Sequence, residues 1–187
     1  SSQAIIDKRR SPCDVIRLEC TEGTVHYINL LSVGFVAEVG ALTNRRFKAF
    51  GEPGYILAVV TKVLGLTPRT FPHACDGGPL VSEPCTFLSF NNSQFTGGKM
   101  MMAPHAEVSD GFAAMVNVGQ MGRLDLLRTF PQIFEGRHVS HPKVATSKVK
   151  RVDFDIREPV DLMIDGEVVR MTPKTLEVLP SALMVAV

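Results

Sequence analysis

The sequence lacks the residue spacing of common zinc sites. No two of its four cysteines have C-x-x-C spacing, and its five histidines are scattered. The cysteines are Cys13, Cys20, Cys75 and Cys85. We therefore expect reduced thiols, as in a cytoplasmic protein, rather than a bound zinc ion.

An excess of charge of one sign and long apolar runs are also missing. The formal net charge is +1, and a nucleic-acid partner would require a basic stripe, so we expect none. The most apolar run, 55–66, contains Lys62 and is shorter than the ~20 residues of a spanning helix. We recognise no signal peptide and expect none. We expect no membrane-spanning segment, while contact with a membrane surface stays open.

No phosphate-binding loop is recognisable. The sequence lacks G-x-x-x-x-G-K-[ST], because Gly98-Lys99 is followed by Met100, and it lacks G-x-G-x-x-G after a strand-like run. No Ser-His-Asp or Cys-His arrangement has a recognisable context. Taken alone, the chain shows no loop that would hold a nucleotide phosphate.

Turn-forming residues are abundant instead. The 15 glycines, 12 prolines and absence of tryptophan favour many short strands, in a chain that is 45% hydrophobic and 21% charged. A length of 187 residues suits one large domain or two small ones. We expect strands at 13–20, 24–31, 70–75, 84–90, 99–103, 112–118, 150–156, 160–164, 167–171, 175–179 and 182–187.

Three segments have the apolar spacing of helices. These are 34–42, 53–66 and 122–134, and the last should end or bend near Pro131. We expect a polar loop at 138–148. Together, the expected strands and helices predict a mainly β (α+β) domain with two or three helices on its flanks.

The 91–111 stretch suits neither a helix nor a regular strand. Gly97 and Gly98 suit a backbone with positive φ or one that passes close to another group. Asp110, which precedes a glycine, is either a turn aspartate or a ligand of Mg²⁺ or Ca²⁺. Asn92 either satisfies backbone groups at a strand end or orients a polar group of a substrate.

A second Asp-Gly pair, Asp165-Gly166, lies between two strand-like runs and predicts a hairpin turn. Glu167 follows it. One interpretation is a solvated glutamate beside an ordinary turn. The other is a carboxylate on a rigid turn, which takes a proton from a substrate hydroxyl or helps to hold a phosphate-bound metal ion. We expect both Asp-Gly segments to belong to one polar site on a β scaffold.

Several short motifs follow one another in a recognisable order. They are Asn29, Gly34-Phe35, Asn92 with Gly97-Gly98, Pro104-x-Ala106-x-x-x-Asp110-Gly111, Asp165-Gly166-Glu167 and Leu179-Pro180-x-Ala182-Leu183. In this order the chain, from about Cys13 onward, resembles the C-terminal domain of the diacylglycerol kinase catalytic family. That family includes bacterial lipid kinases and is similar to sphingosine and ceramide kinases.

The resemblance implies an antiparallel β-sandwich at 13–187, the C-terminal domain of the NAD kinase/diacylglycerol kinase-like fold. Residues 1–12 would be a linker or helix tail from a missing N-terminal ATP-binding domain, and the start at Ser1 suggests a processed or truncated product. The implied reaction moves the γ-phosphoryl group of ATP to a lipid hydroxyl with Mg²⁺. The protein would be cytoplasmic and peripheral to a membrane. Whether it forms a homodimer stays open.

The resemblance also implies roles for individual residues. The Asp110 carboxylate and the carbonyls of Glu107 and Phe112 would ligate Mg²⁺. Glu167 would accept the proton of the lipid hydroxyl or, as in sphingosine kinases, lie beside the metal and the nucleotide. The substrate and nucleotide cleft would contain Asn92, Gly97, Gly98, Asp165 and Gly166.

Some features leave alternatives open. The segment 91–93 reads Asn-Asn-Ser where Gly-Asn-Gly is common in the family, and Lys99 replaces a frequent third glycine. The 53–66 helix and the Phe-rich strands around Phe87, Phe90 and Phe95 either line a lipid channel, or the helix only covers the core. The alternatives to a lipid kinase are a non-catalytic lipid-binding or regulatory module and a relative of the NAD kinases.

Overall fold

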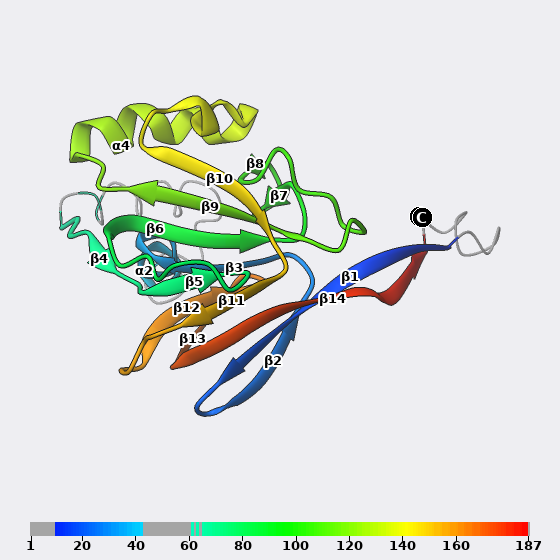
Figure 1. Cartoon of the computed structure of the whole chain (residues 1–187). Coiled ribbons are helices and arrows are strands. Elements are labelled where there is room, and N and C mark those ends of the chain that lie inside the picture. Colours follow the sequence, from blue (N-terminus) through cyan, green and yellow to red (C-terminus); the bar gives the residue numbers. More distant parts are fainter. Residues whose placement is uncertain (1–9, 43–60, 62, 64, 187) are drawn as a thin grey trace.

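The computed structural model describes residues 10–42, 61, 63 and 65–186, and its strands form two antiparallel sheets and a small hairpin (Figure 1). The five-stranded sheet has the order β2 (Gly23–Tyr27), β1 (Arg10–Cys20), β14 (Pro173–Ala186), β11 (Arg151–Phe154), β5 (His73–Cys75). The seven-stranded sheet has the order β10 (Val144–Val149), β9 (Ala113–Gly119), β6 (Pro84–Asn91), β3 (Leu30–Gly34), β12 (Val160–Ile164), β13 (Glu167–Met171), with β4 (Arg69–Thr70) also on β6. The hairpin joins β7 (Phe95–Thr96) to β8 (Met100–Met101).

A hydrophobic core fills the space between the two sheets. Ile16 and Leu18 of β1 are buried there together with Leu88 and Phe90 of β6. The rings of Phe90 and Phe154 meet edge to face with centroids 5.8 Å apart, which joins the sheets directly. The expected antiparallel β-sandwich is therefore confirmed.

A second core lies on the other face of the seven-stranded sheet, under the helices (Figure 1). Phe87 and Val118 project to this face and pack with Leu126 and Ile133 of the helical layer. The helices are α2 (Phe35–Leu42), α4 (Arg123–Thr129) and the 3₁₀ segments η3 (Phe130–Glu135) and η4 (Arg137–Ser140). Because both faces of this sheet are covered, β6 is buried at seven of its eight positions. Its buried polar residues Thr86, Ser89 and Asn91 are hydrogen-bonded.

Two of the three expected helices are within the described residues and are confirmed. The 34–42 run forms α2, and the 122–134 run forms α4 followed by η3. The change to 3₁₀ geometry occurs at Phe130, next to Pro131, as expected for a proline that cannot donate a helical hydrogen bond. Most of the 53–66 helix lies outside the described residues. No described helix is long and apolar enough to cross a bilayer.

Several expectations about strands and loops were wrong. The 24–31 run is not one strand: β2 ends at Tyr27 in the five-stranded sheet, and β3 begins at Leu30 in the other. The 70–75 run is divided in the same way, because β4 pairs with β6 whereas β5 pairs with β11. The described part of the 175–187 region is one strand, β14, rather than two. The 138–148 region is not a loop, because it contains η4 and the edge strand β10. β10 carries polar side chains on exposed positions, which hid its strand character.

The first and last strands, β1 and β14, pair along almost their whole length, from Arg10 with Ala186 to Cys20 with Pro173. Beyond the register shift near Asp14, their ends project from the body of the molecule (Figure 1). Leu183 and Met184 of this projection are 40% and 55% exposed. Ser181 adopts a positive φ of 52° where β14 bends.

Candidate functional site

The crossover between the two sheets, residues 28–30, is held by the carboxylate of Asp165. Its Oδ1 accepts the backbone N–H groups of Asn29 and Leu30 at 3.0 and 2.9 Å, and its Oδ2 accepts that of Ile28 at 3.0 Å. Asp165 itself has a φ of 46°, and Gly166 one of 94°, as in the expected two-residue hairpin turn. The turn between β12 and β13 is thus fixed to the crossover.

Asn92 holds the same crossover from the other side. Its side-chain nitrogen donates to the carbonyls of Ile28 and Asp14 at 3.1 and 2.9 Å, and its backbone N–H donates to Asn29 at 2.7 Å. The Asn92 side chain is fully buried, and its Oδ1 has no hydrogen-bond partner among the described residues. Asn92 therefore joins three segments that are distant in sequence. The hydroxyl of Ser93 adds a 2.7 Å bond to Asn29 Oδ1.

Asp14 is a further member of this network that the sequence did not reveal. It is fully buried, and its two carboxylate oxygens accept the backbone N–H groups of Gly111 and Ser181, both at 2.7 Å. Its own N–H donates to the carbonyl of Val108 at 2.7 Å. The only local signal was a charged residue inside a strand-like run, because both partners of the carboxylate are far away in the chain.

These contacts join two of the expected site residues, Asn92 and Asp165, in one network, called the rim below. The rim runs from Gly111 through Asp14, Asn92 and the 28–30 crossover to Asp165. Glu167, the first residue of β13, lies directly after this turn and is exposed. Among the described contacts it has no ion-pair partner. The rim thus places a free carboxylate next to a fixed turn.

Gly97 and Gly98 do not join the rim. They form the turn between β7 and β8 with φ values of 56° and 87°, and they are exposed. A Cβ at Gly97 would come within 2.8 Å of Met100 Cε, but the end of a methionine can move away, so the positive φ is what favours glycine there. In the part of the chain that the structure describes, no hydrogen bond ties them to Asn92 or Asp165.

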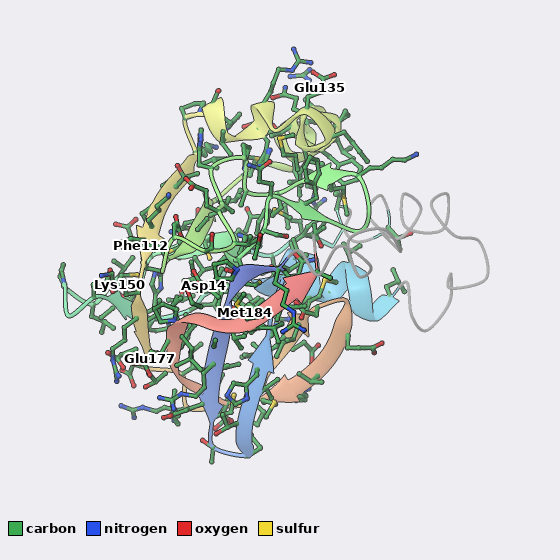
Figure 2. The ribbon with its side chains drawn as sticks, turned by 90° about the vertical axis from the view of Figure 1, so that its right-hand side faces the viewer. Asp14, Phe112, Glu135, Lys150, Glu177 and Met184 are labelled. Atoms are coloured by element: carbon green, nitrogen blue, oxygen red, sulfur yellow. The ribbon has the colours of Figure 1, made fainter. Side chains whose placement is uncertain are left out.

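The bend that contains Asp110, called the elbow below and spanning 107–112, is closed by a lysine. Asp110 Oδ1 accepts the N–H of Phe112 at 3.0 Å, and Asp110 Oδ2 accepts Lys148 Nζ at 2.6 Å. Lys148 Nζ is also 3.3 Å from Glu107 Oε1. Bonding to Asp110, and then to Glu107, raises the pKa of Lys148, so it stays an ammonium ion. Nearby, Lys150 lies over the Phe112 ring, 4.9 Å from its centroid (Figure 2).

The elbow has the donor types that Mg²⁺ prefers, a carboxylate and backbone carbonyls. No group of three His, Cys, Asp or Glu side chains able to hold a metal occurs among the described residues. Mg²⁺ fits at Asp110 only if Lys148 leaves, because Lys148 now holds the available carboxylate oxygen. The Mg²⁺ site at Glu107, Asp110 and Phe112 stays a prediction.

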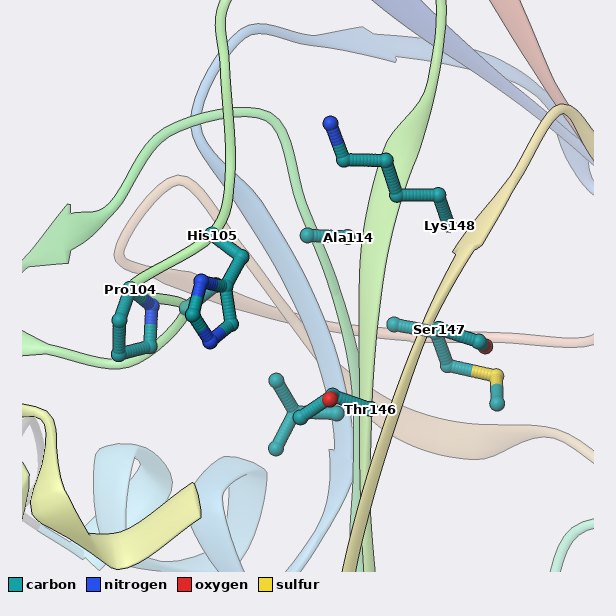
Figure 3. A pocket seen from close by; sticks show the side chains of 9 residues that line it. Pro104, His105, Ala114, Thr146, Ser147 and Lys148 are labelled. Carbon is teal, nitrogen blue, oxygen red and sulfur yellow. The ribbon is translucent and has the colours of Figure 1, made fainter. Parts of the chain in front are cut away.

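A hollow of about 230 Å³ lies beside the elbow. Figure 3 shows Pro104 and His105 on one side of it, Thr146 and Lys148 of β10 on the other, and Ala114 of β9 between them. Its lining combines apolar side chains with hydroxyl, imidazole and ammonium groups. It could receive a small polar group next to the elbow.

An apolar cavity lies further along the same sheet face, between α2, α4, η3 and strands β6 and β9. Its lining includes Phe87, Met102, Val118, Phe130 and His138. Its volume of about 40 Å³ is far below the ~300 Å³ of a typical ligand pocket, so a lipid chain would require the helical layer to move. Phe87, expected near a lipid channel, does line this cavity, whereas Phe90 lies in the core between the sheets and Phe95 is exposed on β7.

His138 is the main polar group in the wall of that cavity. It is 3% exposed, and its Nε2 is 3.1 Å from the Met102 carbonyl oxygen. Its Nδ1 has no hydrogen-bond partner among the described residues. Burial lowers the pKa of His138, which outweighs the opposite effect of the Met102 carbonyl. The imidazole is therefore neutral, with Nε2 as the donor to Met102.

Comparisons with known proteins agree with this architecture. Residues 29–187 match the family model described as the YegS C-terminal NAD kinase beta sandwich-like domain. A diacylglycerol kinase of Mycobacterium tuberculosis is 26% identical over 186 residues, covering 99% of this chain and 60% of the relative. One of Staphylococcus carnosus is 27% identical over 143 residues, covering 76% of this chain and 46% of the relative.

Solved structures give the same picture of the fold. Two Bacillus anthracis structures named as diacylglycerol kinases superpose with TM-scores of 0.72 and 0.63 at 17% and 14% identity. Each covers 99% of this chain, but this chain covers only 59% and 57% of theirs. The chain therefore spans somewhat more than half the length of such proteins.

Proposed function

Because the chain belongs to the family of YegS C-terminal NAD kinase β-sandwich-like domains, we propose that it is the substrate-binding half of a lipid kinase. In this proposal the complete protein moves the γ-phosphoryl group of ATP to a lipid hydroxyl of the diacylglycerol or sphingoid type. The observation that carries the proposal is the exposed Glu167 carboxylate beside the Asp165 turn, which three backbone hydrogen bonds fix to the crossover.

Phosphoryl transfer depends on positioning and on charge neutralisation more than on covalent chemistry by the protein. A carboxylate that takes a proton from a hydroxyl must be within hydrogen-bond reach and must be free of other partners. Glu167 meets the second condition among the described residues, and its position is set by the clamped hairpin. Its proposed role is to accept the proton of the lipid hydroxyl as that oxygen attacks ATP.

ATP would be held by an N-terminal domain of the complete protein, together with the Mg²⁺ that accompanies its phosphates. At the elbow, Asp110 and the carbonyls of Glu107 and Phe112 would hold a second Mg²⁺. When bound, that ion would supply positive charge at the edge of the rim. The residues of this chain position the lipid: Asn92 and Asp165 keep the crossover rigid, and Glu167 faces outward from it.

The apolar cavity is the proposed entry point of the lipid chain. It is lined by Phe87, Met102 and Val118 on the sheet side and by Phe130 of η3. Because its present volume is small, the proposal requires α4 and η3 to move away from β9 when the chain enters. The lipid would come from a membrane surface to which the protein binds peripherally.

The test uses the protein encoded by the complete reading frame, with diacylglycerol or sphingosine in mixed micelles and radiolabelled ATP. Glu167→Gln should lower the turnover number at least ~100-fold, the usual size of a general-base contribution, with little change in folding. Glu158→Gln, at another exposed glutamate, is the matched control and should retain wild-type turnover. Wild-type turnover in Glu167→Gln would remove this residue from the reaction.

The same assay separates the proposal from its main alternative. If the complete protein transfers no phosphate but is retained on lipid vesicles, a non-catalytic lipid-binding module replaces the kinase. If it phosphorylates NAD instead and is not retained on vesicles, it acts like the NAD kinases.

A further inference from the structure

Lys148 sits where a metal ion at the elbow would have to bind. Its ammonium nitrogen is 2.6 Å from Asp110 Oδ2 and 3.3 Å from Glu107 Oε1. The Asp110 side chain is 17% exposed, so this ion pair is partly shielded from solvent. Lys148 therefore neutralises the elbow from within the chain.

Both carboxylate oxygens of Asp110 already have partners. Oδ1 accepts the N–H of Phe112 at 3.0 Å, and Oδ2 accepts Lys148 Nζ at 2.6 Å. The next residue, Gly111, is held by Asp14 Oδ2. Because Oδ1 is bonded to the backbone of the elbow, Oδ2 is the oxygen turned outward to a cation. A metal ion bound to Oδ2 would meet Lys148 there.

An ammonium group and a divalent ion on the same carboxylate repel each other at about 4 Å in a partly desolvated place, so each weakens the binding of the other. We infer that Lys148 competes with divalent cations for Asp110, and so sets how tightly the elbow binds Mg²⁺. The inference rests on the proposed function only in expecting a divalent ion at the elbow, and it can be tested without any kinase assay.

Lys150 provides a matched control. It lies two residues further along the chain, close to the same elbow, but its ammonium group is directed over the Phe112 ring instead of onto a carboxylate. Neutralising Lys150 changes the overall charge by the same amount as neutralising Lys148. Any difference between the two variants therefore reports the direct contact with Asp110.

The experiment titrates the full chain with MgCl₂ by isothermal calorimetry in low-salt buffer and measures its melting temperature with and without the ion. Lys148→Met should bind Mg²⁺ at least about tenfold more tightly than the wild type and should gain a larger Mg²⁺-induced rise in melting temperature. Lys150→Met should behave like the wild type. Adding Asp110→Asn to Lys148→Met should abolish the gain.

Equal Mg²⁺ affinity in the wild type and Lys148→Met would overturn the inference, as would an equal gain in Lys150→Met. If Lys148→Met unfolds in metal-free buffer, Mg²⁺ should restore its thermal transition, and failure to do so would also count against competition. A lack of lipid phosphorylation by the complete protein would refute the proposed function while leaving these binding results unchanged. The two failures are therefore distinguishable.

Discussion

Asp14 and Gly111 lie 97 residues apart in the sequence, yet a carboxylate oxygen of Asp14 accepts the backbone N–H of Gly111 at 2.7 Å. The other oxygen accepts the N–H of Ser181, 167 residues away, at the same distance. One buried side chain of β1 thus attaches that strand both to the elbow and to the last described strand, β14. The rim has its shape because of this attachment.

Removing the Asp14 carboxylate should therefore destabilise the whole domain. Asp14→Ala leaves two backbone N–H groups without their charged acceptor, which we expect to lower the free energy of unfolding by about 2–4 kcal/mol. Urea unfolding monitored by circular dichroism measures this change in the free energy of unfolding. Asp155→Ala, at an exposed aspartate, is the control and should change stability by less than ~0.5 kcal/mol. Equal losses of unfolding free energy in the two variants would mean that the hydrogen bonds of the buried Asp14 carboxylate do not stabilise the domain.

Substitutions of the two acidic residues at the second Asp-Gly turn, Asp165 and Glu167, should change the free energy of unfolding by different amounts. Asp165→Ala removes three hydrogen bonds to the crossover, so its unfolding free energy should fall by about 1–3 kcal/mol. Glu167→Ala has no such contacts among the described residues and should leave stability within about 0.5 kcal/mol of wild type. Thermal and urea unfolding of both variants checks this order. A larger loss of stability in Glu167→Ala than in Asp165→Ala would contradict a stabilising role of the Asp165 hydrogen bonds.

The buried His138 should make stability depend on pH in a defined window. Burial lowers its folded-state pKa below the ordinary value of 6.5, so the unfolded chain takes up a proton at higher pH than the folded protein does. Stability from this group is complete above about pH 6.5 and is lost as the pH falls below it. Glu22 and Asp153, whose pKa values are lowered from 4.5 and 3.8, act only at lower pH.

The measurement compares melting temperatures at about pH 7.5 and about pH 5.5. His138→Gln, which keeps a donor for the Met102 carbonyl, should lose much of the wild-type decrease between these values. His26→Gln, at an exposed histidine, should keep it. An unchanged pH dependence in His138→Gln would show that other groups cause the decrease.

The Cys85 thiol should be unreactive in the folded protein. Burial raises its pKa to about 11, so only about one molecule in a thousand is a thiolate at pH 8. Iodoacetamide labelling followed by peptide mass mapping should show slow modification of Cys85 in buffer and fast modification in urea. Equal rates in both conditions would place Cys85 in an accessible, ordinary environment.

The sequence predicted the features that depend on local chemistry. Asp165-Gly166 forms the expected hairpin because that pair suits positive φ, and the helix before Pro131 changes where proline requires it. The split at 28–29 was missed because no glycine or proline marks it. Its cause is long-range, since Asp165 and Asn92 hold the bend from distant parts of the chain.

The candidate site shows the same difference between local features, which the sequence predicted, and long-range contacts, which it did not. Turn chemistry identified Asp110 and Asp165 as candidates, but only the fold reveals that Asp165 faces backbone N–H groups and that Asp110 faces Lys148. No sequence period distinguishes Lys148 from Lys150, although one neutralises a carboxylate and the other covers a ring. Such distinctions depend on register between β9 and β10.

The pairing of β1 with β14 has a consequence for synthesis. Strand β1 cannot complete its side of the sheet until β14, which ends at Ala186, has left the ribosome. Until then β1 has only β2 beside it, and an isolated two-stranded hairpin is marginally stable in water. Folding of this unit should thus wait for the synthesis of β14, and a nascent chain stalled shortly before Pro173 should remain open to protease at β1.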